Sequence, residues 1–109
     1  MARPFVMAWV AAGALVLTGA AAPARANVRI VTVSSLAFAP APEGLKVGDT
    51  VMWVNLDLFE HTVTARNGAF DVDLKPGAKA SIVLKQPGSV DYYCRFHPGM
   101  TGKMVVGPR

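Results

Sequence analysis

The 109-residue sequence has few cysteines, few histidines and few charged residues. It contains one cysteine, so no disulfide can form within the chain and a disulfide framework is excluded. Only two residues, His61 and His97, are histidines. The Lys and Arg residues are scattered singly, which excludes the basic footprint of a nucleic-acid-binding protein. No apolar run reaches the roughly 20 residues of a comfortable membrane span.

The first 26 residues have the pattern of a secretory signal peptide. Arg3 gives a positive start, an apolar stretch runs from Phe5 to Leu17, and Ala24-Arg25-Ala26 forms an A-x-A cleavage signal. We therefore expect a periplasmic protein with a signal peptide at 1–26 and one mature domain at 27–109. An uncleaved anchor is the alternative. Cleavage would lower the net charge from +4 to +2, without a polybasic patch, so we expect no stable membrane association afterwards.

Residues 27–109 alternate between apolar and polar positions with a period of two, which is typical of strands. Turn signals such as Asn67-Gly68 separate these stretches, and the two prolines of 38–42 indicate an irregular or edge segment. No stretch of ten residues favours a helix, and 56–60 could hold one helical turn at most. The pattern predicts an all-β sandwich or barrel of seven or eight strands, with strands at 28–33, 45–47, 50–55, 61–65, 80–84, 89–94 and 103–106.

The residues with the most distinctive chemistry lie near the C-terminus, in the run Tyr93-Cys94-Arg95-Phe96-His97-Pro98-Gly99-Met100. A free cysteine is often a buried structural residue, and a methionine is often core filler. Here a thiol, an imidazole and a thioether follow one another at three-residue steps, and the Pro-Gly pair suits a tight turn around a metal. This spacing favours a metal site over either structural alternative.

The only other histidine, His61, would have to join this run from elsewhere in the fold. Two imidazoles and one thiolate with a weak axial thioether form the blue-copper arrangement. The sequence therefore predicts one type 1 copper ion bound by His61, Cys94, His97 and Met100. Zinc gains little from a thioether, and two histidines cannot supply the further copper sites of a copper enzyme. We expect no enzymatic activity.

Two stretches carry a family resemblance: the run from Tyr93 to Lys103, and the segment 48–55 that leads to His61. They resemble the small cupredoxins of the amicyanin and plastocyanin kind. The resemblance implies a Greek-key β-sandwich with copper at one end, which shuttles single electrons through His97. It also implies redox partners such as a c-type cytochrome or a quinone-cofactor dehydrogenase, and we expect a monomer. Periplasmic copper delivery or sequestration is an alternative that would use the same ligands.

Two positions depart from the amicyanin pattern, in which a proline often precedes the first histidine and an asparagine often follows it. Here these positions hold Glu60 and Thr62. The resemblance implies that the N–H of Thr62 donates to the sulfur of Cys94, while the side-chain link made by asparagine stays open. We expect Glu60 to face outward. We also expect an apolar rim around His97, formed by Phe38, Leu58, Phe59, Phe96 and Pro98.

Overall fold

The computed structural model describes residues 27–109 without a break, together with residues 2, 4, 11–15 and 19. Most of the predicted signal peptide at 1–26 lies outside the described residues. Within the described part of the chain, no helix is long and apolar enough to cross a membrane.

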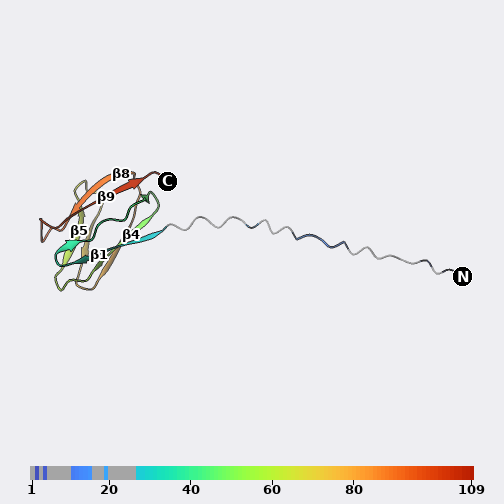
Figure 1. Ribbon diagram of the computed structural model, residues 1–109, viewed down its shortest axis with the longest axis horizontal. Helices are drawn as coiled ribbons and strands as arrows, with labels where there is room; N and C mark the ends of the chain where they lie inside the picture. Colours follow the sequence, from blue (N-terminus) through green and yellow to red (C-terminus); the bar gives the residue numbers. More distant parts are fainter. Residues whose placement is uncertain (1, 3, 5–10, 16–18, 20–26) are drawn as a thin grey trace.

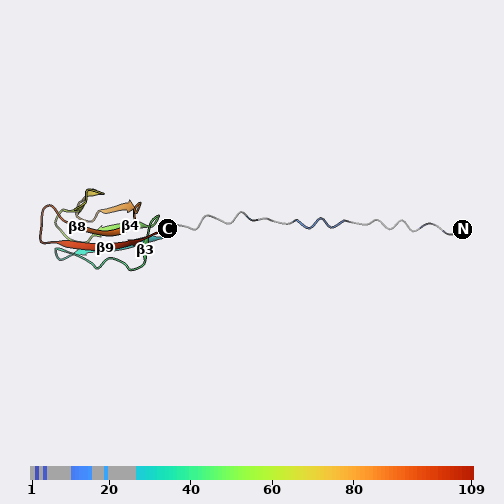
Figure 2. The same cartoon turned by 90° about the horizontal axis from the view of Figure 1, so that it is seen from above.

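Two β-sheets face each other and enclose the core (Figure 1, Figure 2). The described residues form the strands β1 (Val28–Ser34), β2 (Ala37–Phe38), β3 (Leu45–Lys46), β4 (Thr50–Asn55), β5 (His61–Ala65), β6 (Asp71–Leu74), β7 (Lys79–Val83), β8 (Gly88–Tyr93) and β9 (Thr101–Gly107). One sheet has the order β2-β1-β4-β7, and the other has the order β3-β9-β8-β5-β6. The pairs β1–β4 and β3–β9 are parallel, and the other pairs are antiparallel. The predicted all-β sandwich is confirmed.

The structure has nine strands in the described residues, where the sequence predicts seven or eight. The segment after Phe38, which contains the two prolines, is irregular, and β2 lies at a sheet edge. Both features agree with the prediction for residues 38–42. Strand β6 is not predicted because two of its four residues are aspartates, which are depleted in strands. It forms because its backbone pairs with β5 over four residues. Residues 56–60 contain no helical turn.

The core lies between the sheets and is centred on Tyr92. Its ring meets Phe38 edge-on at a centroid distance of 5.0 Å and Trp53 at 5.6 Å. Such edge-to-face pairs add to the stabilisation from burial alone. Phe38 is therefore a core residue, and its predicted place in the rim around His97 is wrong.

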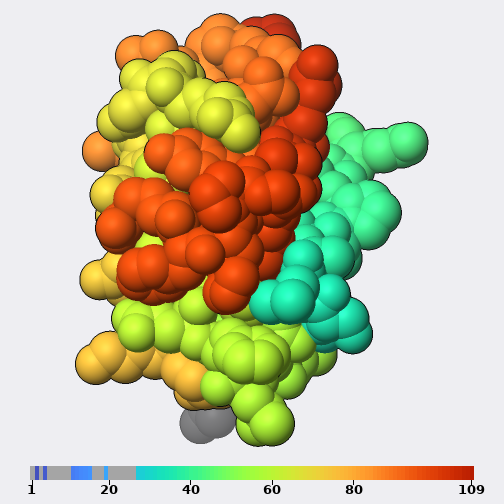
Figure 3. Space-filling view, turned by 90° about the vertical axis from the view of Figure 1, so that its left-hand side faces the viewer, coloured from blue at the N-terminus to red at the C-terminus, as the bar shows by residue number. Residues whose placement is uncertain are grey.

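The strands also determine which loops meet. β1 and β4 run parallel and finish at the same end of the sandwich. β8 also finishes at this end, and β5 and β9 begin there. The connections 35–36, 56–60 and 94–100 therefore lie at one end of the sandwich. Figure 3 looks onto this end and shows the orange-red 94–100 loop beside the lime-green 56–60 segment.

Gly102 gives a direct test of the core packing. A Cβ at this position would overlap the buried ring of Tyr92. We expect Gly102→Ala to lower the free energy of unfolding of the copper-free protein by about 1–3 kcal/mol, measured by urea denaturation, because a full core must distort to admit the methyl group. Gly99→Ala is the control, since its Cβ would meet no atom within 4 Å. Equal losses in both variants would contradict this packing.

Candidate metal centre

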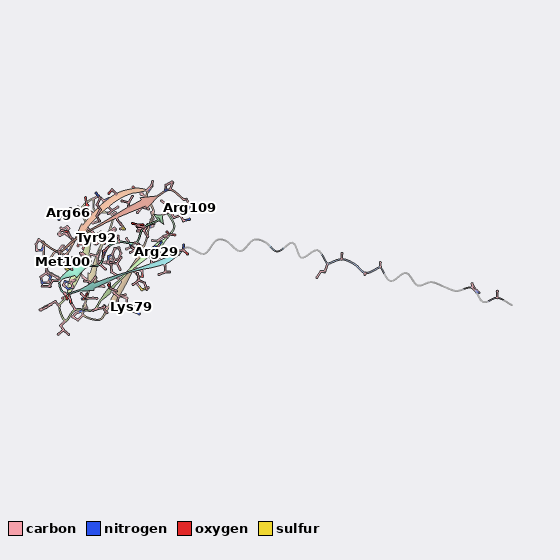
Figure 4. All side chains as sticks on the ribbon, viewed as in Figure 1. Arg29, Arg66, Lys79, Tyr92, Met100 and Arg109 are labelled. Atoms are coloured by element: carbon pink, nitrogen blue, oxygen red, sulfur yellow. The ribbon has the colours of Figure 1, made fainter. Side chains whose placement is uncertain are left out.

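The four predicted ligands come from two neighbouring parts of the fold. His61 is the first residue of β5, Cys94 follows β8 directly, and His97 and Met100 lie in the loop that leads into β9. The ligand atoms of His61, Cys94 and His97 all lie within 4.8 Å of one another. Figure 4 shows Met100 at this end of the sandwich, away from Arg109 and with Tyr92 between them. The structure thus brings together residues 33 positions apart in sequence.

Backbone hydrogen bonds fold the 94–100 loop back on itself. His97 N–H donates to the carbonyl of Cys94 at 3.3 Å, and Met100 N–H donates to the carbonyl of His97 at 2.8 Å. Cys94 N–H donates to the carbonyl of Met100 at 3.1 Å, which closes the loop. The three-residue spacing of the motif therefore corresponds to two consecutive turns, and the direction of each side chain is set by the backbone.

Burial divides the four side chains unequally. His61 and Cys94 are fully buried and Met100 is 4% exposed, whereas His97 is half-buried. The ring of His97 stands edge-on to that of Phe59, with centroids 6.3 Å apart. Of the predicted rim residues, four are exposed and surround this end: Leu58, Phe59, Phe96 and Pro98. His97 is thus the one member of the set that reaches solvent.

Three groups converge on the sulfur of Cys94. The N–H of Thr62 donates to Sγ at 3.3 Å, which confirms the predicted hydrogen bond. The Nδ1 atoms of His61 and His97 each lie 3.7 Å from Sγ. Burial alone would raise the pKa of this thiol, but the hydrogen bond from Thr62 N–H and the contact with the His97 imidazole lower its pKa to about 6. The site therefore favours the thiolate, the form that binds metal.

The side chain of Thr62 makes the link between the ligand segments that the sequence left open. Its Oγ1 accepts the backbone N–H of Arg95 at 2.8 Å, immediately after Cys94. The Oγ1 atoms of Thr62 and Thr64 are 2.9 Å apart, and Thr64 donates to Asp71 at 2.8 Å. The guanidinium of Arg95 also donates to Asp71 at 3.2 Å. Thr62 therefore joins β5 to the cysteine loop through both its backbone and its hydroxyl.

The carboxylate next to His61 belongs to Asp57, a residue that no motif in the sequence marks. Asp57 Oδ2 lies 2.8 Å from His61 Nε2, while Glu60 is exposed as expected. Hydrogen bonds from Leu36 N–H, His61 and Ser35 N–H hold the pKa of Asp57 below its ordinary value. Two acidic residues stand in the loop before β5, and no sequence signal distinguishes the inward one from the outward one.

The chemistry of the donor set fits copper. A thiolate and a thioether are soft ligands that suit copper, and imidazole binds copper well in addition. Both imidazoles present Nδ1 toward the sulfur, so three donor atoms already face a common point in a water-poor setting.

Comparison with known proteins gives the same answer. A family model described as a cupredoxin-like domain matches residues 5–106. The chain belongs to the cupredoxin-like family. Amicyanin of Paracoccus versutus is 31% identical over 93 residues, which cover 80% of this chain and 70% of that protein. Amicyanin-alpha of Methylorubrum extorquens is 33% identical over 102 residues, covering 88% of this chain and 83% of that protein.

Solved structures agree with this assignment. The structure of an oxidised amicyanin variant superposes with a TM-score of 0.64 at 28% identity, covering 72% of this cupredoxin and 81% of that chain. A Cu(I) form of another amicyanin variant superposes with a TM-score of 0.63 at 29% identity, covering 74% and 83%. The predicted family, the copper cofactor and the non-enzymatic role as a type 1 copper electron carrier are confirmed.

The lowered pKa of Cys94 can be measured in the copper-free protein. We expect the ultraviolet absorbance of the thiolate to rise with pH around a midpoint of about 6, against an ordinary thiol value of 9.0. Because the folded-state pKa is the lower one, this group contributes stability that is fully present above pH 9.0 and is lost as the pH falls through about 6. Cys94→Ser should show no such absorbance step. A midpoint near 9 in the unsubstituted protein would contradict the hydrogen bonding described here.

The hydroxyl of Thr62 can be tested with a matched pair of variants. Thr62→Val keeps the shape of the side chain but leaves Arg95 N–H and Thr64 without their hydroxyl partner. We expect it to lower the free energy of unfolding of the copper-free protein by about 1–3 kcal/mol in urea denaturation. Thr62→Ser retains the hydroxyl and should lose less. If Thr62→Val and Thr62→Ser had equal free energies of unfolding, the hydroxyl of Thr62 would contribute nothing to stability.

Proposed function

We propose that this cupredoxin is a periplasmic electron carrier whose single copper ion is held by His61, Cys94, His97 and Met100. The observation that supports these ligands most strongly is the convergence of three donor atoms within 4.8 Å at one end of the sandwich. Met100 completes the set because its carbonyl bonds to Cys94 N–H and its side chain is buried at the same end. The segment 1–26 is the export signal in this proposal, and 27–109 is the working domain.

Copper, when bound, supplies the one-electron couple between Cu(I) and Cu(II). The protein holds the donor atoms still while the charge changes. His61 and Cys94 are attached to paired strands and are fully buried, so neither the backbone nor entering water can readily rearrange around them. A fixed first shell in a dry setting keeps the reorganisation that accompanies electron transfer small. His97, which is half-buried, then provides a route from the centre to the surface.

The surface around His97 suits brief encounters with another redox protein. Leu58 is 91% exposed, and Phe59 and Phe96 are 57% and 50% exposed. A small apolar patch can exclude water from the contact without burying enough area for a long-lived complex, as redox encounters require. We propose that a c-type cytochrome or a quinone-cofactor dehydrogenase docks on this rim, and that the carrier itself is a monomer.

The experiment that tests this function begins with Cu(II) added to the purified copper-free protein. We expect an intense blue colour from thiolate-to-copper charge transfer, lost in Cys94→Ser. Electron self-exchange, measured by nuclear magnetic resonance line broadening in mixtures of the two redox states, should be fast.

Metal retention separates electron transfer from copper delivery or sequestration. A carrier should keep its copper through repeated reduction and oxidation in the presence of a Cu(I) chelator, because three of its four ligands are buried and held by the fold. A colourless Cu(II) protein would contradict the proposed ligand set. Slow self-exchange with ready release of Cu(I) would instead support copper delivery and contradict the carrier.

A further inference from the structure

The carboxylate of Asp57 contacts three hydrogen-bond donors. It lies in the loop between β4 and β5, and its side chain is 12% exposed. Its Oδ1 accepts Ser35 N–H at 2.6 Å, and its Oδ2 accepts Leu36 N–H at 3.0 Å. The same Oδ2 lies 2.8 Å from Nε2 of the fully buried His61. One carboxylate thus joins the turn between β1 and β2 to the first residue of β5.

This contact determines which nitrogen of His61 carries the proton. A carboxylate only accepts hydrogen bonds, so a neutral imidazole next to it places its proton on Nε2. The other nitrogen, Nδ1, then carries a free lone pair and lies 3.7 Å from the sulfur of Cys94. Histidine ligands of metals commonly have their second nitrogen held in this way by a carboxylate or a carbonyl.

The turn on the other side of Asp57 is strained. Ser35 and Leu36 have φ values of 52° and 58°, in the left-handed region that glycine and asparagine tolerate best. A non-glycine residue in this region persists only where its surroundings hold it in place. Here both N–H groups of the strained turn point at the same carboxylate, and the side chain of Leu36 is exposed at the end of the sandwich that carries the site.

We propose that Asp57 is a positioning residue for the copper centre, an inference that rests on the proposed ligand role of His61. It fixes the tautomer and direction of the His61 ring, and it ties that ring to the strained turn as one rigid unit. Its negative charge also makes the imidazole a stronger donor, which stabilises Cu(II) relative to Cu(I) and lowers the midpoint potential. Asparagine could not replace it, because a single amide oxygen cannot serve all three donors.

Two variants with the same loss of charge separate positioning from simple electrostatics. Asp57→Asn and Glu60→Gln each remove one negative charge from the loop before His61, but Glu60 is exposed and makes no hydrogen bond to His61. We expect Asp57→Asn to raise the midpoint potential of the copper-loaded protein and to weaken Cu(II) binding by about 10–100-fold in chelator competition. Glu60→Gln should leave both close to those of the unsubstituted protein.

A second measurement uses the copper-free protein. Nitrogen-15 spectra of the His61 ring should show a single tautomer protonated at Nε2, and a mixture of tautomers in Asp57→Asn. If Asp57→Asn proves unstable, it can be examined together with Leu36→Gly, which keeps the N–H donor and relieves the left-handed strain.

The outcomes are distinct. An unchanged potential and an unchanged tautomer in Asp57→Asn would overturn the proposal, and so would equal shifts in Asp57→Asn and Glu60→Gln. If the unsubstituted protein formed no blue centre, the ligand set would fail instead, whatever the ring spectra showed.

Discussion

The hydrogen bonds between Thr62 and the chain around Cys94 are the interaction on which the site depends. The N–H of Thr62 donates to the cysteine sulfur, and its hydroxyl accepts the N–H of the following residue, Arg95. One residue of β5 therefore holds both the side chain and the backbone of the cysteine loop. Because His61 directly precedes Thr62, the same contacts set the distance between an imidazole and the thiolate before any metal binds.

Around this link, the fold supports the site from two sides. Thr64, Asp71 and Arg95 continue the hydrogen bonds of Thr62 outward across the sheet. Asp57 contacts His61 from the loop before β5, and it accepts a hydrogen bond from Ser35 N–H in the turn between β1 and β2. These polar groups near the centre thus form hydrogen bonds within the protein, and the imidazole nitrogens and the thiolate sulfur face one another. A centre held in this way has little freedom to change shape when its charge changes, as an electron carrier requires.

The sequence predicts best what depends on local spacing. The Cys94, His97 and Met100 steps correspond to consecutive turns of one loop, and the β-branched residues of β4 and β5 predict both strands. Family resemblance supplies the hydrogen bond from Thr62 N–H, because a backbone donor survives a change of side chain.

What the sequence does not predict depends on contacts between distant segments. Strand β6 takes its conformation from pairing with β5, against the preference of its aspartates. Phe38 is drawn into the core by Tyr92, which lies on the other sheet. The roles of Asp57 and Glu60 differ only because one faces the β1–β2 turn and the other faces solvent. Such pairings form only in the folded chain, and the sequence of either partner alone does not predict them.

X-ray absorption at the copper edge of the Cu(II) protein reports the atoms bonded to the metal, and therefore shows whether Cys94 is a ligand. We expect one thiolate sulfur at short bonding distance together with two imidazole nitrogens. A coordination shell made only of nitrogen and oxygen would show that Cys94 does not bind the copper and that the proposed centre is wrong.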